Sequence, residues 1–162
     1  ESGAPSGAVW LFAEELAPVC SPSLLKSRPL RRAEDLSRHV LLHIEDPDNP
    51  SPWLAWSNWL EAVGLRNLKP AGAVRFNYFD QCVRAALAGQ GVALGRLPLV
   101  QELLRDGSLV APFPQRAHTM RSYWLVRPTP PAHRPHVDRF AEWLLRTVGA
   151  STASRARIAG KR

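Results

Sequence analysis

The segment from Val74 to Pro98 limits the possible folds more than any other part of the chain. It combines a strand end, a helix with one apolar face, two closely spaced glycines and a buried apolar run. Asn77 stands where a side chain can cap the helix. Gly89 and Gly91 suit a helix end followed by a sharp entry into a strand at 92–94. The helical positions that share one face are Phe79, Cys82, Val83, Ala86 and Leu87. This spacing predicts a helix packed on a sheet, and therefore an α/β unit.

The rest of the chain alternates in the same way between apolar runs and helical patterns. The predicted strands are 16–20, 40–44, 109–110 and 122–126, and the predicted helices begin at Pro52, Leu97 and Pro135. Gly64, Gly107 and Gly149 are expected to end these helices. Residues 1–9 carry no structural signal, 11–15 read as a short acidic turn, and 46–50, 112–121 and 128–131 read as loops. Strands separated by helices predict a mainly parallel sheet with helices packed on it.

Tryptophans are concentrated in the predicted helix that starts at Pro52. Trp53, Trp56, Leu60 and Val63 share one face, and Trp59 lies beside it. Such a stripe is either a stacking platform for a ligand or part of a core, and its helical spacing favours the core.

The charge of +7 over 162 residues raises the question of nucleic-acid binding. Four of the basic residues lie in Ser151–Arg162, which has no acid, so the rest of the chain carries only +3. We expect 149–162 to be a disordered basic tail. No apolar run approaches the roughly 20 residues that a membrane span needs, and no secretory signal pattern is seen, so no membrane association is expected.

The residue types needed for catalysis or metal binding do not form a familiar pattern. Cys20 and Cys82 both lie in apolar sequence and are expected to be reduced core residues; a redox pair is the alternative. The five histidines lack metal-ligand spacing apart from His133-x-x-His136 in a proline-rich turn. No nucleophile elbow or phosphate-binding loop is present. We therefore expect neither an enzyme nor a cofactor or metal; a hydrolase using Cys20 and a distant histidine is the enzyme alternative.

A family resemblance rests on the residues of the central segment. Phe76-x-x-x-Asp80, the small-residue helix Val83–Gly89 and the run Gln90–Gly95 resemble the effector-binding domain of LysR-type transcriptional regulators. Within that family they are similar to the regulators of glycine cleavage and of β-lactamase. The resemblance continues in register through 15–22, 53–64, 107–113, 123–128 and 140–144. It covers nearly everything from Leu11 to Val148, and the joint order of the motifs makes it specific.

The resemblance implies a periplasmic-binding-protein-like (type 2) fold, in which two α/β lobes with mainly parallel sheets are joined by two crossing strands. On this map 1–21 and 111–148 form a partial first lobe, and 22–110 form the second lobe. The family's winged helix-turn-helix, its linker helix and about half of the first lobe are expected to be absent from this chain.

The resemblance also implies that a small effector binds in the cleft between the lobes. The matching positions are Cys20, Ser21, Phe76, Asn77, Tyr78, Ala93, Leu94, Gly95 and Tyr123. The helix start at Asn77 would favour a carboxylate, with Arg75 or Arg96 as a partner. Each residue also has a structural explanation: Asn77 as a cap, Phe76 as core, and the arginines as surface charges.

By the same resemblance, the chain is an effector-binding regulatory domain that binds a small-molecule co-inducer. We expect a cytoplasmic protein that forms a homodimer or tetramer. Contact with DNA would be made only through the winged helix-turn-helix that this chain lacks. A free-standing solute-binding protein of the same fold is the alternative. The cleft residues do not choose among amino acids, aromatic acids, peptidoglycan fragments and inorganic anions as effectors.

Overall fold

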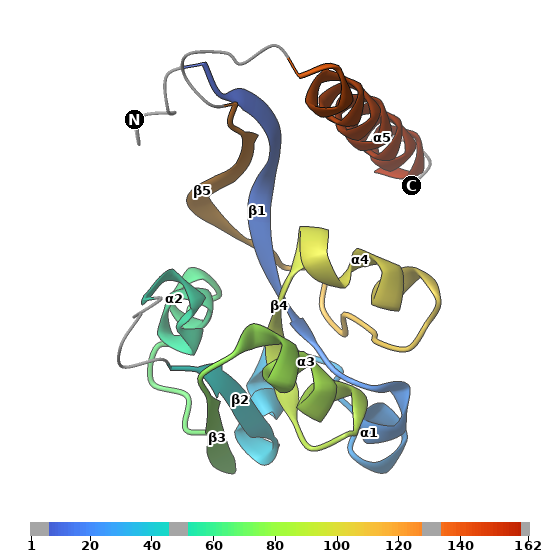
Figure 1. Ribbon diagram of the computed structural model, residues 1–162. Coiled ribbons are helices and arrows are strands. Elements are labelled where there is room, and N and C mark those ends of the chain that lie inside the picture. Colours follow the sequence, from blue (N-terminus) through green and yellow to red (C-terminus); the bar gives the residue numbers. More distant parts are fainter. Residues whose placement is uncertain (1–6, 46–51, 128–133, 160–162) are drawn as a thin grey trace. The chain divides into compact units, whose positions relative to one another are not determined.

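The structure is a computed structural model that describes residues 7–45, 52–127 and 134–159, with side chains in the last helix described as far as Gly149. The chain forms two compact units. Unit 1 consists of Glu1–Ala13 and Met120–Arg162, and unit 2 consists of Glu14–Thr119. Two strands, β1 (Val9–Val19) and β5 (Ala117–Leu125), each contribute residues to both units (Figure 1).

Between these strands the chain alternates helices and strands, as the sequence predicts. The remaining elements are α1 (Pro22–Ser27), η1 (Ala33–Arg38), β2 (Val40–Ile44), η2 (Pro52–Leu54), α2 (Trp56–Ala62), β3 (Gly72–Phe76), α3 (Phe79–Leu87), β4 (Val92–Arg96), α4 (Leu97–Arg105) and α5 (Pro135–Ala159), where η denotes a 3-10 helix. The strands form one five-stranded sheet in the order β3-β2-β4-β1-β5. β2 pairs in parallel with both β3 and β4, while β1 pairs antiparallel with β4. The predicted α/β fold with a mainly parallel sheet is confirmed.

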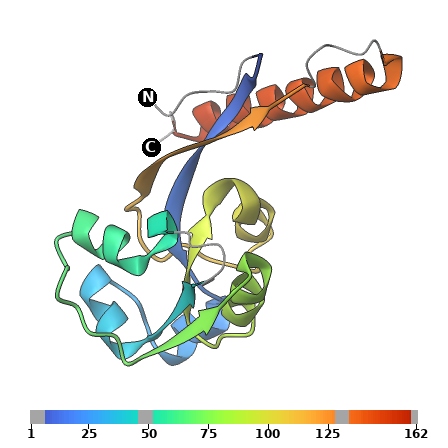
Figure 2. The ribbon, with the colours of Figure 1, turned by 60° about the vertical axis from the view of Figure 1, so that its left-hand side comes forward.

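Helices cover both faces of the sheet in unit 2, and each face has its own core (Figure 2). On one face α2 contributes Trp56 and Trp59, whose residues are 2% and 0% exposed. The Trp56 indole nitrogen donates to the carbonyl oxygen of Leu42 at 2.9 Å, and the Trp59 and Phe113 rings stack with centroids 6.0 Å apart. The other face is covered by α3 and α4. Trp56 and Trp59 are core residues, as predicted, whereas Trp53 is only partly buried.

The central segment folds largely as its sequence predicts. β3, α3 and β4 follow one another, and Gly89 takes the left-handed conformation at φ +74° just past the helix. The predicted helix cap at Asn77 is wrong by one residue. Tyr78 is the N-cap, because its backbone is still extended at φ −119° and ψ 137°. The Tyr78 side chain makes no capping hydrogen bond. The first turn of α3 therefore has no side-chain cap.

Several predicted boundaries are wrong, and those of the strands are wrong because pairing between distant strands overrides local signals. β1 begins at Val9, so 11–15 are strand and not a turn. β5 begins at Ala117, inside the predicted loop 112–121. The predicted strand 109–110 is reduced to a bridge between Cys20 and Val110. The helix predicted from Pro52 is broken into η2 and α2, because Ala55 between them is extended.

Unit 1 contains the first part of β1, the last part of β5, and α5. Phe12 and Tyr123 pack with ring centroids 4.7 Å apart, and Arg127 pairs with Asp138 at 3.2 Å. The apolar residues of α5 differ in exposure. Ala141 is 2% exposed, whereas Phe140 is 58% exposed. The helix also continues past Gly149 to Ala159, since Ala and Arg favour helix.

Two further comparisons with the sequence predictions concern boundaries. The predicted loops 46–50 and 128–131 lie outside the described residues. The compact units divide at Ala13/Glu14 and Thr119/Met120, whereas the lobe boundaries implied by the family resemblance lie at 21/22 and 110/111. The difference arises because Leu16–Val19 of β1 pairs with β4 inside unit 2.

Among the described helices, none is long and apolar enough to cross a membrane.

We predict that Gly91→Ala destabilises the fold. A Cβ at this position would lie 2.5 Å from the backbone carbonyl oxygen of Val40, which cannot rotate away. We expect a loss of about 1–3 kcal/mol in the free energy of unfolding, measured by urea denaturation. Gly149→Ala is the control: no atom lies within 4 Å of the added Cβ, so this helical site should gain about 0.5–1 kcal/mol. Equal urea midpoints for Gly91→Ala and the wild type would contradict the close approach.

Candidate functional site

The parallel strands bring their carboxyl ends to one edge of the sheet. Ile44 at the end of β2 is level with Phe76 at the end of β3, and β4 ends at Arg96 beside them. β1 runs in the opposite direction, so Leu16 lies opposite Arg96 at this same edge. Ligands of open α/β sheets collect at the carboxyl ends of strands. We call this end of unit 2 the carboxyl edge.

Three of the predicted site residues lie consecutively at the carboxyl edge. Phe76 is half-buried against the core on the α3 side, and Asn77 is exposed. Tyr78 is 62% exposed and immediately precedes α3. The uncapped first turn of α3 presents backbone N–H groups and the positive end of the helix dipole here, which suits an anionic group.

The predicted residues on β4 support this edge from inside. Ala93, Leu94 and Gly95 are all buried. Gly95 permits a close approach of β1, since a Cβ there would lie 2.9 Å from both methyl groups of Val19. These buried residues therefore fix the position of β4, and the end of β4 brings Arg96 to the edge.

Cys20 and Ser21 lie at the opposite end of the sheet. Val19 is level with Ala93 near the start of β4, and Cys20 continues beyond it to pair with Val110. Ser21 caps α1, accepting a hydrogen bond from the Leu24 amide at 3.3 Å, and is 3% exposed. The structure does not bring these two residues together with Phe76–Tyr78. Tyr123 belongs to unit 1, where it packs on Phe12.

The sequence reasoning missed a buried acid at the carboxyl edge. Glu14 of β1 is 1% exposed, and its Oε1 atom lies 2.5 Å from both Nε and Nη2 of Arg96. The Arg96 guanidinium also lies over the Phe79 ring, 5.6 Å from its centroid. The Thr119 hydroxyl donates to the Glu14 carbonyl oxygen at 3.3 Å. The available signal was a pair of acids, Glu14 and Glu15, in an otherwise apolar run, which local reasoning interpreted as a turn.

A second ion pair at this edge is of a different kind. Arg75 of β3 pairs with Glu45, just after β2, and their side chains are 62% and 60% exposed. Such exposed pairs contribute little to stability because water screens them. Beside them, the Nε2 atom of His43 is buried and has no hydrogen-bond partner among the described residues.

The cysteines are structural and chemically protected. Burial raises the pKa of Cys20 to about 11 and that of Cys82 to about 12. Both thiols are free, and they belong to cores on opposite faces of the sheet, which argues against a redox pair. Within the described part of the chain, no cluster of three or more His, Cys, Asp or Glu residues is suited to hold a metal ion.

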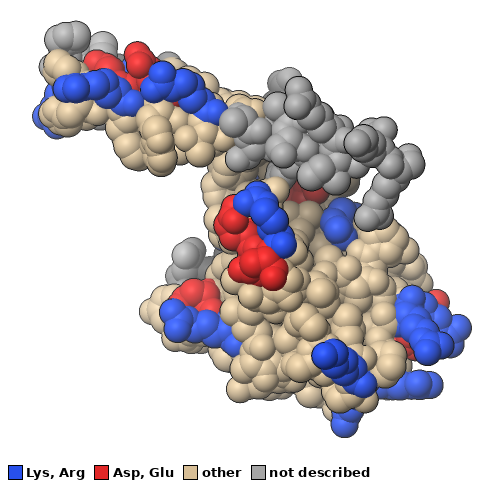
Figure 3. Space-filling model, turned by 90° about the vertical axis from the view of Figure 1, so that its right-hand side faces the viewer, with Lys and Arg blue, Asp and Glu red and all other residues tan. Residues whose placement is uncertain are grey.

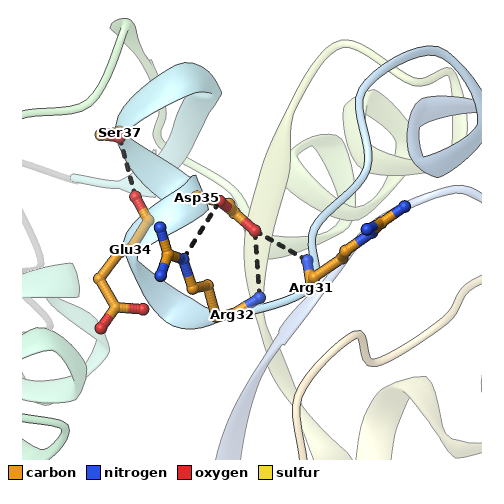
Figure 4. Close-up of polar contacts among 5 residues, drawn as sticks. All are labelled: Arg31, Arg32, Glu34, Asp35 and Ser37. Atoms are coloured by element: carbon orange, nitrogen blue, oxygen red, sulfur yellow. Dashed lines mark hydrogen bonds and ion pairs between the residues drawn. The ribbon is translucent and has the colours of Figure 1, made fainter.

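A separate surface depression of about 440 Å³ lies elsewhere on unit 2. It is lined by Glu34, Ser37 and residues 64–69, none of which the sequence predicted as a binding residue. Nearby, the Asp35 carboxylate accepts hydrogen bonds from the backbone amides of Arg31 and Arg32 at 2.9 and 3.1 Å, which hold the pKa of Asp35 below its usual value (Figure 4). These contacts explain the start of η1 and require no ligand.

The surface charge on the face shown in Figure 3 does not point to a nucleic-acid site. On the face shown in Figure 3, Lys and Arg side chains alternate with acidic groups and with large uncharged areas, and they form no continuous basic surface. This distribution agrees with the modest charge of the chain outside its last residues.

Taken together, the mixed sheet, the helices on both of its faces and the crossing strand β1 define a fold of the periplasmic-binding-protein-like (type 2) class. Residues 5–149 match the LysR substrate binding domain, and the chain belongs to this family. The resemblance drawn from the sequence is thereby confirmed.

Curated relatives agree with this family. The glycine cleavage system transcriptional activator of Escherichia coli K12 is 32% identical over 141 residues, which cover 86% of this chain and 44% of that protein. The regulator TrpI of Pseudomonas aeruginosa is 34% identical over 141 residues, which cover 83% of this chain and 44% of that protein. The chain thus spans less than half the length of these relatives. They are transcriptional regulators, and the prediction that the chain is not an enzyme is confirmed.

Solved structures show the same fold. The effector domain of AmpR from Pseudomonas aeruginosa matches with a TM-score of 0.70 and 28% identity, covering 92% of this chain and 68% of that one. The AmpR effector binding domain from Citrobacter freundii matches with a TM-score of 0.68 and 26% identity, covering 88% of this chain and 68% of that one.

We predict that neither cysteine reacts with iodoacetamide in the folded protein at pH 7.5. The thiolate is the reactive form, and burial disfavours it at both sites. Mass spectrometry should show no added group in native buffer and two added groups in denaturant. Rapid labelling of either thiol in native buffer would show that it is accessible.

We also predict that stability falls as the pH drops from 7.5 to 5.5, partly through His43. Burial lowers the pKa of His43, the Arg75 charge lowers it further, and Glu45 partly opposes this. Because the folded-state pKa lies below the unfolded value of about 6.5, the unfolded chain takes up the proton first as the pH falls. The stability that His43 contributes is therefore fully present above the unfolded-state pKa and is lost as the pH falls through the folded-state pKa. His43→Gln should flatten the pH dependence of the urea midpoint.

Proposed function

We propose that this chain is the effector-binding regulatory domain of a LysR-type bacterial transcriptional regulator, and that it binds a small-molecule co-inducer. The observation that carries the proposal is the family match over residues 5–149 together with relatives that are transcriptional regulators. The alternative of a free-standing solute-binding protein of the same fold is not favoured by these relatives.

Within unit 2, we assign effector binding to the carboxyl edge. The uncapped helix start at Tyr78 offers backbone donors, and Asn77 and the Tyr78 hydroxyl offer exposed polar groups beside it. Cys20 and Ser21 at the other end of the sheet take structural roles in this assignment. Tyr123 of unit 1 stays a candidate contact from the family resemblance.

In the intact regulator, binding would act by shifting a conformational equilibrium. An effector that binds one arrangement of the domain more tightly increases its population, and the free energy available for the switch equals the difference in binding. We propose that the intact protein is a homo-oligomer located in the cytoplasm, and that contacts with DNA are made by a separate winged helix-turn-helix. The domain described here supplies the sensing step.

A thermal-shift screen tests the effector site. The purified chain is heated with amino acids, small carboxylates and muropeptide-like compounds, and a ligand of the folded state raises the melting temperature. At a concentration about 100 times its Kd, a ligand adds about 2.7 kcal/mol. We expect at least one saturable shift, which Asn77→Ala or Tyr78→Ala reduces strongly.

Asn67→Ala provides a matched control, because Asn67 is also an exposed asparagine but lines the separate depression. It should leave the shift unchanged. Loss of the shift in Asn67→Ala with retention in Asn77→Ala would move the site to the depression. A cooperative melt without any shift across the panel would contradict effector binding by this chain.

A further inference from the structure

We propose that Arg96 binds a carboxylate group of the effector and that buried Glu14 positions its guanidinium for this task. This inference rests on the proposed function and narrows the ligand class to carboxylates. Arg96 is the last residue of β4 and the N-cap of α4, so it stands at the carboxyl edge itself.

The exposure of the two partners is unequal in a way that favours the guanidinium as the recognition group. The Glu14 side chain is 1% exposed, while that of Arg96 is 25% exposed. The negative partner is thus confined to the interior, and the positive partner reaches the surface. An ion pair that served stability alone would gain little here, since desolvation offsets much of the attraction in buried pairs.

The contacts of Arg96 also fix its orientation. Its Nε and Nη2 atoms both lie 2.5 Å from Glu14 Oε1, and the guanidinium lies over the Phe79 ring. These contacts on two sides reduce the rotamer entropy that a ligand would otherwise have to remove. A planar guanidinium held in this way is suited to bidentate binding of a carboxylate.

The location joins two features that favour an anion. Phe79, under the guanidinium, is the first residue of α3, so Arg96 lies beside the uncapped start of that helix. The backbone donors of the first turn and the arginine then act on the same region. By contrast, Arg75 on the same edge is 62% exposed and paired with an exposed acid.

Matched ligand pairs test this proposal. Glycine and glycinamide, acetate and acetamide, and benzoate and benzamide are compared by thermal shift with the wild-type chain. A charge-assisted hydrogen bond predicts that the carboxylate member binds about ten- to hundred-fold more tightly than its amide. Arg75→Gln, on the same edge, should preserve this preference.

Two variants keep the test valid if loss of Arg96 alone prevents folding. Arg96→Lys keeps the charge opposite Glu14 but loses the planar fork, and we expect about ten-fold weaker binding of the carboxylate member. The double variant Glu14→Gln/Arg96→Gln leaves no unpaired buried charge and should abolish the preference for carboxylates. Retention of the preference in the double variant would overturn the proposal.

The outcomes separate this inference from the proposed function. Equal binding of carboxylates and amides to the wild type would overturn the role of Arg96 and leave effector binding intact. A folded wild-type chain that binds no compound in this panel or in the wider effector screen would contradict both. A carboxylate preference lost only in the Arg96 variants supports both.

Discussion

The antiparallel pairing of β1 with β4 is the constraint on which unit 2 depends. Leu16 through Val19 pair with Arg96 through Ala93, and every one of these β1 residues is buried. The pairing sets β1 into the sheet beside the parallel strands and permits no slip. A shift by one residue would exchange side chains between the two cores and move Glu14 away from Arg96. Gly95 allows the strands and α4 to pack this closely, because it adds no side chain between Val19 and Val100.

The same pairing makes a buried acid tolerable. A carboxylate as buried as Glu14 loses several kcal/mol of hydration, and only a well-placed opposite charge offsets that loss. Arg96 provides it from a position 82 residues away in sequence. Removal of the arginine alone would leave an uncompensated charge at a cost of about 3–5 kcal/mol, whereas exchange of both partners for neutral groups avoids this. Stability and recognition can therefore be separated experimentally at this pair.

Local sequence signals predicted the parts of the fold that local chemistry determines. The left-handed glycines at 64, 89 and 107, the strand 40–44 and the tryptophan core follow from turn residues and periodicity, and the structure has them all. The extent of β1 and the start of β5 were missed because both are set by pairing partners far away in sequence. Asn77 was assigned as the cap from residue type alone, and the extended backbone of Tyr78 moves the helix start by one residue.

The candidate site also combines residues that local sequence signals reveal with residues that only strand pairing brings together. Asn77 and Tyr78 could be found from sequence because they precede a recognisable helix. Cys20 and Ser21 were grouped with them through the family resemblance, but the antiparallel direction of β1 carries the residues after Val19 to the far end of the sheet. Because β1 runs antiparallel to β4, its earlier part, which contains Glu14, lies at the carboxyl edge. Strand direction thus decides which residues meet the helix start of α3, and it favours Arg96 with Glu14 over Ser21 as the group that meets an anionic ligand.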